Sequence, residues 1–198
     1  MLLKDTIGIF PNALSAEFCD ELIHTFHQHS SKQHRGMSGK GEVKNDVKNT
    51  IDLDLMGYPE FEPLVHIISE TANNKICEYI ESFPGQDKFN NYHLLFTGTR
   101  FPTWQLQYYK QQEGHFNAYH TEGNRPEFFD RLFAVMFYLN DVEEGGQTEF
   151  LYPELLIKPT KGTFLVWPAP WPYIHKGHVP LSGDKYILTT WALQNNYQ

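Results

Sequence analysis

The chain has 198 residues, a formal net charge of −8 and an aromatic content of 15%. This length favours one well-buried domain, because a division would leave two small ones. The acidic balance argues against nucleic acid and anionic membrane surfaces as partners, since both attract basic proteins. The aromatic content is typical of a core rich in β-strands.

Cysteine usage and hydropathy predict the setting of the protein. Cys19 and Cys77 lie in separate helix-like stretches, without the spacing of a disulfide framework or a Cys-x-x-Cys metal motif. We therefore expect a reduced, cytoplasmic environment. No window has the apolar length of a signal peptide or a membrane span, so we expect no membrane association.

The N-terminal residues predict a strand followed by a helix. Residues 7–10 form a short apolar strand that stops at Pro11, and Ser15 can then cap a helix. The apolar residues of this helix recur at helical spacing: Phe18, Leu22, Ile23 and Phe26. Residues 36–49 have no period and predict a loop, of a length that often serves as a lid.

A second strand and a second helix follow this loop. Residues 50–55 alternate between apolar and polar side chains, as a half-buried strand does. Apolar residues at helical spacing from Leu64 to Ile80 then predict a helix that ends at Pro84 and Gly85. We expect both helices to pack on the outside of a sheet.

The second half of the chain predicts strands throughout. Runs of strand-forming residues are separated by turn residues, and they lie at 104–110, 131–139, 155–158, 162–167 and 185–193. Many short strands with this punctuation are typical of a sandwich or jelly roll.

One pair of residues in this half predicts a metal site. His120 and Glu122 lie in a run of strand-forming residues, where side chains two apart point to the same face. A histidine from a neighbouring strand would complete two imidazoles and one carboxylate, the ligand set of non-heme Fe(II) oxygenases. Both His175 and His178 are candidates, but their three-residue offset allows only one of them to face the metal.

An ordered series of motifs resembles a known family. The series consists of His120-Thr121-Glu122, residues 138–150 with their Gly145-Gly146 pair, Pro159-Thr160-Lys161-Gly162, and His175-Lys176-Gly177 with Lys185 ten residues later. Together these motifs resemble the 2-oxoglutarate- and Fe(II)-dependent oxygenases of the prolyl 4-hydroxylase type. The resemblance covers about residues 100–193, with a weaker echo in the N-terminal strand and helix.

The resemblance implies a fold as well as a chemistry. It implies a mainly β, α+β protein with a double-stranded β-helix (jelly roll) and N-terminal helices on the outside of the major sheet. We expect a single oxygenase domain over residues 1–198, with supporting strands and helices in 1–99 and the jelly-roll core in 100–198.

The resemblance also implies the iron ligands and the co-substrate lysine. The iron ligands would be His120, Glu122 and His175, and Gly177 decides for His175 over His178 because the family has a glycine two residues after that histidine. Lys185 matches the lysine that binds the distal carboxylate of 2-oxoglutarate. A buried anion needs such a cation at the end of its pocket.

Four further positions match functional residues of the family. Tyr109 and Thr148 match hydroxyl groups that bind the same carboxylate of 2-oxoglutarate. Arg131 and Trp191 match positions that face the peptide substrate, with a surface arginine and a core tryptophan as the alternative interpretations.

Three residues depart from the family pattern. Glu122 stands where the family usually has aspartate, and its extra methylene would permit bidentate ligation or a displaced iron. Asn117 replaces a tyrosine that faces the substrate, and Leu193 replaces a histidine found in some relatives. The peptide-facing positions are therefore less family-like than the iron and co-substrate positions.

The expected function follows from the resemblance. We expect an Fe(II)- and 2-oxoglutarate-dependent dioxygenase, with O2 as oxidant and ascorbate as an optional reductant, that hydroxylates prolyl residues in a peptide or protein. The alternatives are another amino-acid side chain, a small molecule, or a metal- and ligand-binding module without turnover. Dealkylation of nucleic acid is disfavoured by the acidic charge, and the sequence makes no prediction of oligomeric state.

Overall fold

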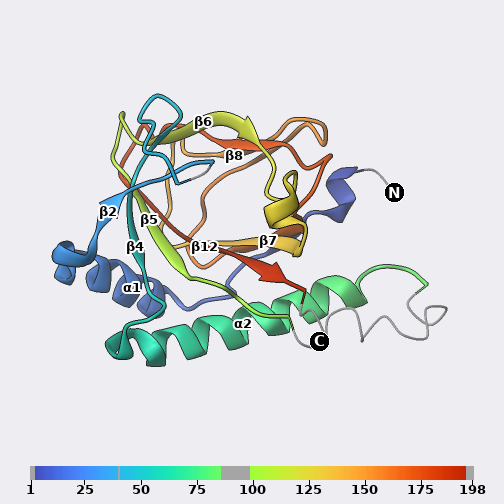
Figure 1. Ribbon diagram of the computed structural model, residues 1–198, viewed down its shortest axis with the longest axis horizontal. Coiled ribbons are helices and arrows are strands. Elements are labelled where there is room, and N and C mark those ends of the chain that lie inside the picture. Colours follow the sequence, from blue (N-terminus) through green and yellow to red (C-terminus); the bar gives the residue numbers. More distant parts are fainter. Residues whose placement is uncertain (1–2, 40, 86–98, 195–198) are drawn as a thin grey trace.

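In the part of the chain that the structure describes, two antiparallel sheets lie face to face, and two α-helices cover the outside of the larger one (Figure 1). The computed structural model describes residues 3–39, 41–85 and 99–194. The helices are α1 (Ala16–Gln28) and α2 (Glu62–Glu81). Short 3-10 helices lie at Leu3–Thr6, Ser30–Lys32, Pro59–Phe61 and Pro126–Phe128.

Within the described residues, the larger sheet has seven strands and the smaller sheet has five. In spatial order the larger sheet contains β1 (Gly8–Phe10), β10 (Phe164–Pro168), β7 (Arg131–Tyr138), β12 (Lys185–Leu193), β5 (Gln105–Tyr109), β4 (Ile51–Asp54) and β2 (His34–Arg35). The smaller sheet contains β3 (Lys48–Asn49), β6 (His115–His120), β11 (His175–Gly177), β8 (Thr148–Phe150) and β9 (Leu155–Ile157). This arrangement confirms the expected double-stranded β-helix with helices outside the major sheet.

The larger sheet separates two hydrophobic cores because its side chains alternate between its faces. On β7, Val135 and Phe137 pack with Leu22 of α1 and Ile68 of α2, all of them fully buried. The intervening residues, Ala134, Met136 and Tyr138, point toward the smaller sheet and belong to the second core. Each large apolar side chain buried in this way contributes about 1.5–3 kcal/mol.

The first helix begins where the sequence predicts it. The side-chain oxygen of Ser15 accepts a hydrogen bond of 3.1 Å from the backbone N–H of Phe18, so it satisfies one of the free donors at the helix start. Cys19, Leu22 and Phe26 form the buried face. Among the described residues, no helix is long and apolar enough to cross a membrane. Cys19 and Cys77 are free thiols, and the cytoplasmic setting stays a prediction.

The sequence patterns did not predict several of the short strands. The predicted loop 36–49 contains an isolated bridge between Ser38 and Glu42 and ends in β3, which pairs with β6. Strands β8 and β11 have three residues each, too few to show a period. Pairing with neighbours, rather than local preference, makes these segments extended.

The chain crosses from one sheet to the other between β3 and β4. Lys48 of β3 lies in the smaller sheet and Asp52 of β4 in the larger one, and their Nζ and Oδ2 atoms are 2.8 Å apart. Thr50, at the crossing, donates a second hydrogen bond of 2.7 Å to the Oδ1 atom of Asp52. Both charged residues are buried, at 3% and 0% exposure, so this ion pair ties the two sheets together from within.

Candidate metal and co-substrate site

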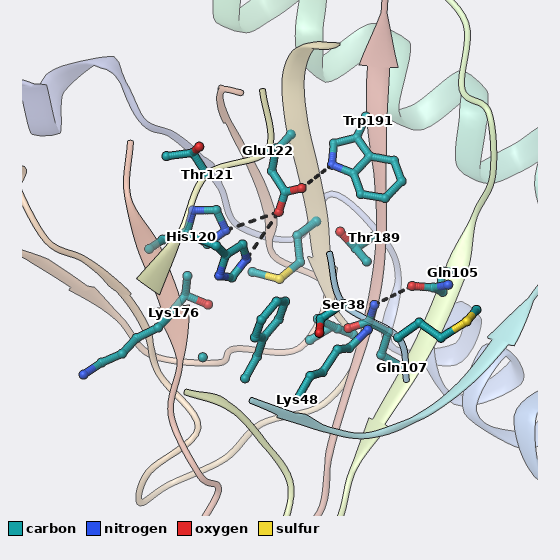
Figure 2. A pocket seen from close by; sticks show the side chains of 18 of the residues that line it. Ser38, Lys48, Gln105, Gln107, His120, Thr121, Glu122, Lys176, Thr189 and Trp191 are labelled. Carbon is teal, nitrogen blue, oxygen red and sulfur yellow. Dashed lines mark hydrogen bonds and ion pairs between the residues drawn. The ribbon is translucent and has the colours of Figure 1, made fainter. Parts of the chain in front are cut away.

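Three potential metal ligands converge between the two sheets. His120, at the end of β6, lies directly opposite His175, at the start of β11, in the ladder of the smaller sheet. The Oε1 atom of Glu122 is 3.4 Å from Nε2 of His120 and 3.6 Å from Nε2 of His175. All three ligand atoms lie within 4.8 Å of one another, as binding to a single ion requires (Figure 2).

The carboxylate reaches this cluster by a different route from the one predicted. β6 ends at His120, so Glu122 lies beyond the strand, and the expectation that both side chains share one strand face was wrong. The backbone N–H of Glu122 instead donates a hydrogen bond of 3.0 Å to the carbonyl of Ala169. This contact with the chain that follows β10 fixes the turn that aims the carboxylate at the histidines.

Backbone carbonyls orient both imidazole rings. Nδ1 of His120 donates to the carbonyl of Ala118 at 2.8 Å, and Nδ1 of His175 donates to that of Tyr173 at 3.0 Å. With the proton on Nδ1, each Nε2 carries the lone pair that a metal binds. Phe116 also stacks on His120, with ring centroids 3.9 Å apart and an angle of 13° between the planes.

The protonation states of the cluster suit metal binding. Burial acts to raise the pKa of Glu122, but hydrogen bonds and charge interactions with His120 and His175 outweigh it and hold that pKa well below its usual range. Burial, followed by the nearby charge of His120, lowers the pKa of His175. An ionised carboxylate and a neutral imidazole are the forms that coordinate metals. The donor set therefore fits Fe(II).

A buried amine lies in the same cavity as this cluster. Lys185 is 1% exposed, and its Nζ atom donates a hydrogen bond of 2.8 Å to the carbonyl of Gly146. Gly146 has a φ of +71°, which favours glycine, and this turn places its carbonyl on the amine. Burial lowers the pKa of Lys185 to about 7. No carboxylate forms an ion pair with Lys185 within residues 3–39, 41–85 and 99–194, so the amine is suited to an external anion.

The two residues predicted to supply hydroxyl groups line the same cavity as this amine. Tyr109 is opposite Lys185 in the β5–β12 ladder, and the amine lies 4.6 Å from the centre of its ring. The Tyr109 hydroxyl donates to Oε1 of Gln107 at 2.9 Å. Thr148 accepts a hydrogen bond of 2.6 Å from the Tyr138 hydroxyl, which leaves the threonine's own proton free to donate to an anion.

Sequence reasoning missed the partners of these hydroxyl groups. Gln107 lies two residues before Tyr109 on β5, and strand alternation would have placed it on the same face. Tyr138 belongs to a quoted motif, but only the fold shows that its hydroxyl binds Thr148.

Arg131 and Trp191 both contact the carboxylate of the cluster. The indole Nε1 of Trp191 donates to Oε2 of Glu122 at 2.7 Å, and Arg131 donates to the same oxygen at 3.3 Å. Both side chains also line the cavity, so a contact with substrate stays a prediction. The alternative interpretation of Arg131 as a surface residue was wrong, because its side chain is only 14% exposed.

The cavity has a volume of about 490 Å³ and includes all eight predicted site residues in its lining. From the segment expected to form a lid, Met37, Ser38, Gly39, Gly41 and Lys48 contribute to the wall. The lid function stays a prediction. Asn117 is exposed and Leu193 is buried, and neither lines this cavity.

Other histidines lie outside the cluster. His178 forms a 2.5 Å hydrogen bond with Glu149 instead of facing the three ligands. Its position agrees with the choice of His175. His93 lies outside the described residues.

Comparisons with known proteins agree with the site and the fold. A model of the 2OG-Fe(II) oxygenase superfamily matches residues 104–193. A probable prolyl 4-hydroxylase from Arabidopsis thaliana is 23% identical over 116 residues, which are 48% of this chain and 40% of that protein. The matched region therefore spans about two-fifths of that relative's length.

Solved structures of prolyl hydroxylases share the fold over nearly the whole chain. A viral collagen prolyl hydroxylase from Paramecium Bursaria Chlorella virus-1, in complex with 2OG, is 20% identical with a TM-score of 0.66 and covers 94% of both chains. A prolyl hydroxylase from Trichoplax adhaerens, in complex with a hypoxia inducible factor peptide, is 14% identical with a TM-score of 0.73 and covers 98% of this chain and 88% of its own.

A prolyl 4-hydroxylase from Pseudomonas putida has the same fold, with 14% identity, a TM-score of 0.68 and coverage of 97% of both chains. The match to the family model includes the three converging ligands and the buried lysine. Residues 104–193 are therefore similar to the 2OG-Fe(II) oxygenase superfamily, and prolyl 4-hydroxylases are among the proteins that the chain resembles.

Proposed function

We propose that the protein is an Fe(II)- and 2-oxoglutarate-dependent dioxygenase that hydroxylates prolyl residues in a peptide or protein. The products besides the hydroxylated residue are succinate and CO2. The observation that carries this proposal is one cavity that combines a His-Glu-His cluster with a buried amine lacking a carboxylate partner among the described residues.

The chain supplies the ligands and the positioning for this chemistry. His120, Glu122 and His175 would hold the metal through Nε2, Oε1 and Nε2, all from one side. Lys185 and Thr148 would bind the distal carboxylate of 2-oxoglutarate by charge and by hydrogen bond. When bound, Fe(II) with 2-oxoglutarate and O2 supplies the oxidising power to hydroxylate an unactivated C–H bond.

The cavity walls would keep water away from the reacting groups. Met136 and Ile187 line the cavity from β7 and β12, and both are at most 5% exposed. Removing water strengthens the attraction between the amine of Lys185 and an anion. Placement of the substrate then decides which C–H bond reacts.

Similarity to known prolyl hydroxylases supports a prolyl substrate, and the residues that line the cavity support the binding of a peptide segment. The matched relatives include a probable prolyl 4-hydroxylase and a prolyl hydroxylase solved with a peptide. In this chain, Met37, Phe128 and Arg125 line the cavity together and offer apolar and cationic groups to a peptide.

A spectroscopic experiment tests the co-substrates and the substrate separately. We expect the anaerobic protein with Fe(II) and 2-oxoglutarate to develop a visible metal-to-ligand charge-transfer band. Admission of O2 should then release succinate, and proline-containing peptides should increase the rate. Absence of the band would refute the oxygenase assignment. A band with succinate release that no peptide stimulates would refute the prolyl substrate alone.

A further inference from the structure

The two carboxylate oxygens of Glu122 have separate surroundings (Figure 2). Oε1 faces the Nε2 atoms of His120 and His175, at 3.4 and 3.6 Å. Oε2 points the other way and accepts hydrogen bonds from Trp191, at 2.7 Å, and Arg131, at 3.3 Å. The carboxylate therefore has one oxygen directed at the metal cluster and one oxygen bound by the protein.

Neighbouring strands fix both donors. Trp191 lies in β12, opposite Ala134 of β7, in the middle of the larger sheet. The guanidinium of Arg131 lies between two aromatic rings, 3.6 Å from the ring centre of Trp191 and 3.8 Å from that of Phe128. Such stacking holds a guanidinium in one orientation, so the donors are already in place before a metal binds.

Arg131 also fixes the backbone of the glutamate. Its NH1 atom donates to the carbonyl of Glu122 at 3.0 Å, while the N–H of Glu122 donates to Ala169 at 3.0 Å. With the backbone held from both sides, the reach of the side chain decides where its oxygens lie. An aspartate here would lack one methylene, so it could not meet both the histidines and the indole N–H.

We propose that Arg131 and Trp191 are positioning residues that make Glu122 a metal ligand through one oxygen only, at a site fitted to the length of glutamate. Engaging Oε2 in two hydrogen bonds opposes bidentate ligation and leaves more coordination positions open for co-substrates. These two hydrogen bonds, from Arg131 and Trp191 to Oε2, form a clamp on Glu122. The clamp also offsets the extra rotational freedom that a glutamate side chain has compared with aspartate. This inference rests on the proposed function, but it concerns metal binding and not turnover.

The test measures Co(II) binding to the whole chain without 2-oxoglutarate or O2. Trp191→Phe keeps an aromatic ring but removes the indole donor, and we expect it to weaken Co(II) binding by about tenfold or more, as loss of partners of metal ligands does. The visible Co(II) absorption should change as well, because Oε2 then keeps only the longer hydrogen bond, that from Arg131. Trp171→Phe is the matched control, since Trp171 is 66% exposed and should leave both readouts unchanged.

A double-mutant cycle distinguishes a clamp from a general packing effect. Glu122→Asp should weaken Co(II) binding in the native background, yet cost little more when combined with Trp191→Phe, because the clamp is then already broken. Native Co(II) affinity and an unchanged spectrum in Trp191→Phe would overturn the proposal, as would fully additive effects. If thermal melting shows that Trp191→Phe does not fold, Arg131→Gln, which retains the indole, is measured by the same readouts.

The proposed function and this inference can fail separately. A native protein that binds Co(II) with the expected response to Trp191→Phe, yet releases no succinate with Fe(II), would leave the clamp standing and refute the oxygenase. A native protein that oxidises 2-oxoglutarate but binds metal equally well without the indole donor would refute the clamp alone.

Discussion

Replacing Lys185 by methionine is expected to weaken 2-oxoglutarate binding by about 10- to 100-fold, the value of one charge-assisted hydrogen bond. The apo-protein should stay at least as stable, because Lys185 is 1% exposed and no carboxylate forms an ion pair with it in the described part of the chain. Methionine fills a similar volume without a buried charge. Titration of the charge-transfer band measures the affinity, and urea unfolding measures the stability.

The matched control for this prediction is His175→Ala. His175 is one of the three converging ligands, so its loss should abolish Fe(II) binding and the charge-transfer band together. Lys185→Met should retain Fe(II) and change only the concentration of 2-oxoglutarate needed for the band. Equal 2-oxoglutarate affinity in native and Lys185→Met proteins would show that the anion binds elsewhere.

The pH dependence of the stability of the apo-protein tests the buried amine of Lys185 independently. Burial lowers the pKa of Lys185 to about 7 in the folded protein, against about 10.4 in an unfolded chain. Between these values the unfolded chain binds a proton that the folded chain does not, so the apo-protein gains stability as pH rises from about 7 to about 10. Below about pH 7 both states are protonated, and the full cost of the buried charge is present.

The effect on ligand binding has the opposite sign. An anion is recognised by the ammonium form, so the affinity for 2-oxoglutarate should fall as pH rises above about 7. Both dependences should vanish in Lys185→Met. Unfolding and titration series between pH 6.5 and 9 check them at about half-unit steps. A flat affinity profile in the native protein would indicate that the amine stays charged over this whole range.

The sequence predicted the chemistry of the site better than its geometry. Residue types alone left His175 and His178 open as partners of His120, and the resemblance to a known family selected His175 and assigned Lys185 to the co-substrate. What brings them together is cross-strand register, which places His120 opposite His175 and Tyr109 opposite Lys185. Strand register depends on the tertiary structure, so the repeating pattern of a single segment does not predict it.

Glu122 shows where a local argument fails. Strand alternation placed it on the face of His120, yet β6 ends at His120 and a contact with Ala169 positions the glutamate. The same limit applies to Arg131 and Trp191, which lie 60 residues apart and meet at one carboxylate oxygen. Family resemblance directed both to the substrate, which stays a prediction, and it did not indicate their hydrogen bonds to Glu122.

The sequence predicted those helices and strands whose apolar pattern extends over enough residues to be recognised. Helices α1 and α2 and the strands β5, β7 and β12 lie where apolar patterns indicated. The crossing from β3 to β4 was not predictable, because it depends on an ion pair between a residue of the predicted loop and a residue of the predicted half-buried strand. Lys48 and Asp52 are only four residues apart, but they belong to different sheets.

Removing one partner of this pair is the second large effect that we expect. Asp52→Ala should lower the free energy of unfolding by about 3–5 kcal/mol, since it leaves the Lys48 amine buried without a counter-charge. It also removes the acceptor of the Thr50 hydroxyl. Urea unfolding followed by tryptophan fluorescence measures the change. Glu143→Ala is the control, because its ion pair with Lys158 is exposed and should contribute about 0–1 kcal/mol.

The double variant separates the charge from the packing. Lys48→Met combined with Asp52→Ala removes both charges, so it should recover most of the stability that Asp52→Ala loses, because the uncompensated ammonium is gone. A loss for Asp52→Ala no larger than that of the exposed control would mean that water from the adjoining cavity solvates Lys48. In that case the hydrophobic cores and the β-ladders alone hold the two sheets together. The ion pair between Lys48 and Asp52 then only orients the chain where it crosses at Thr50.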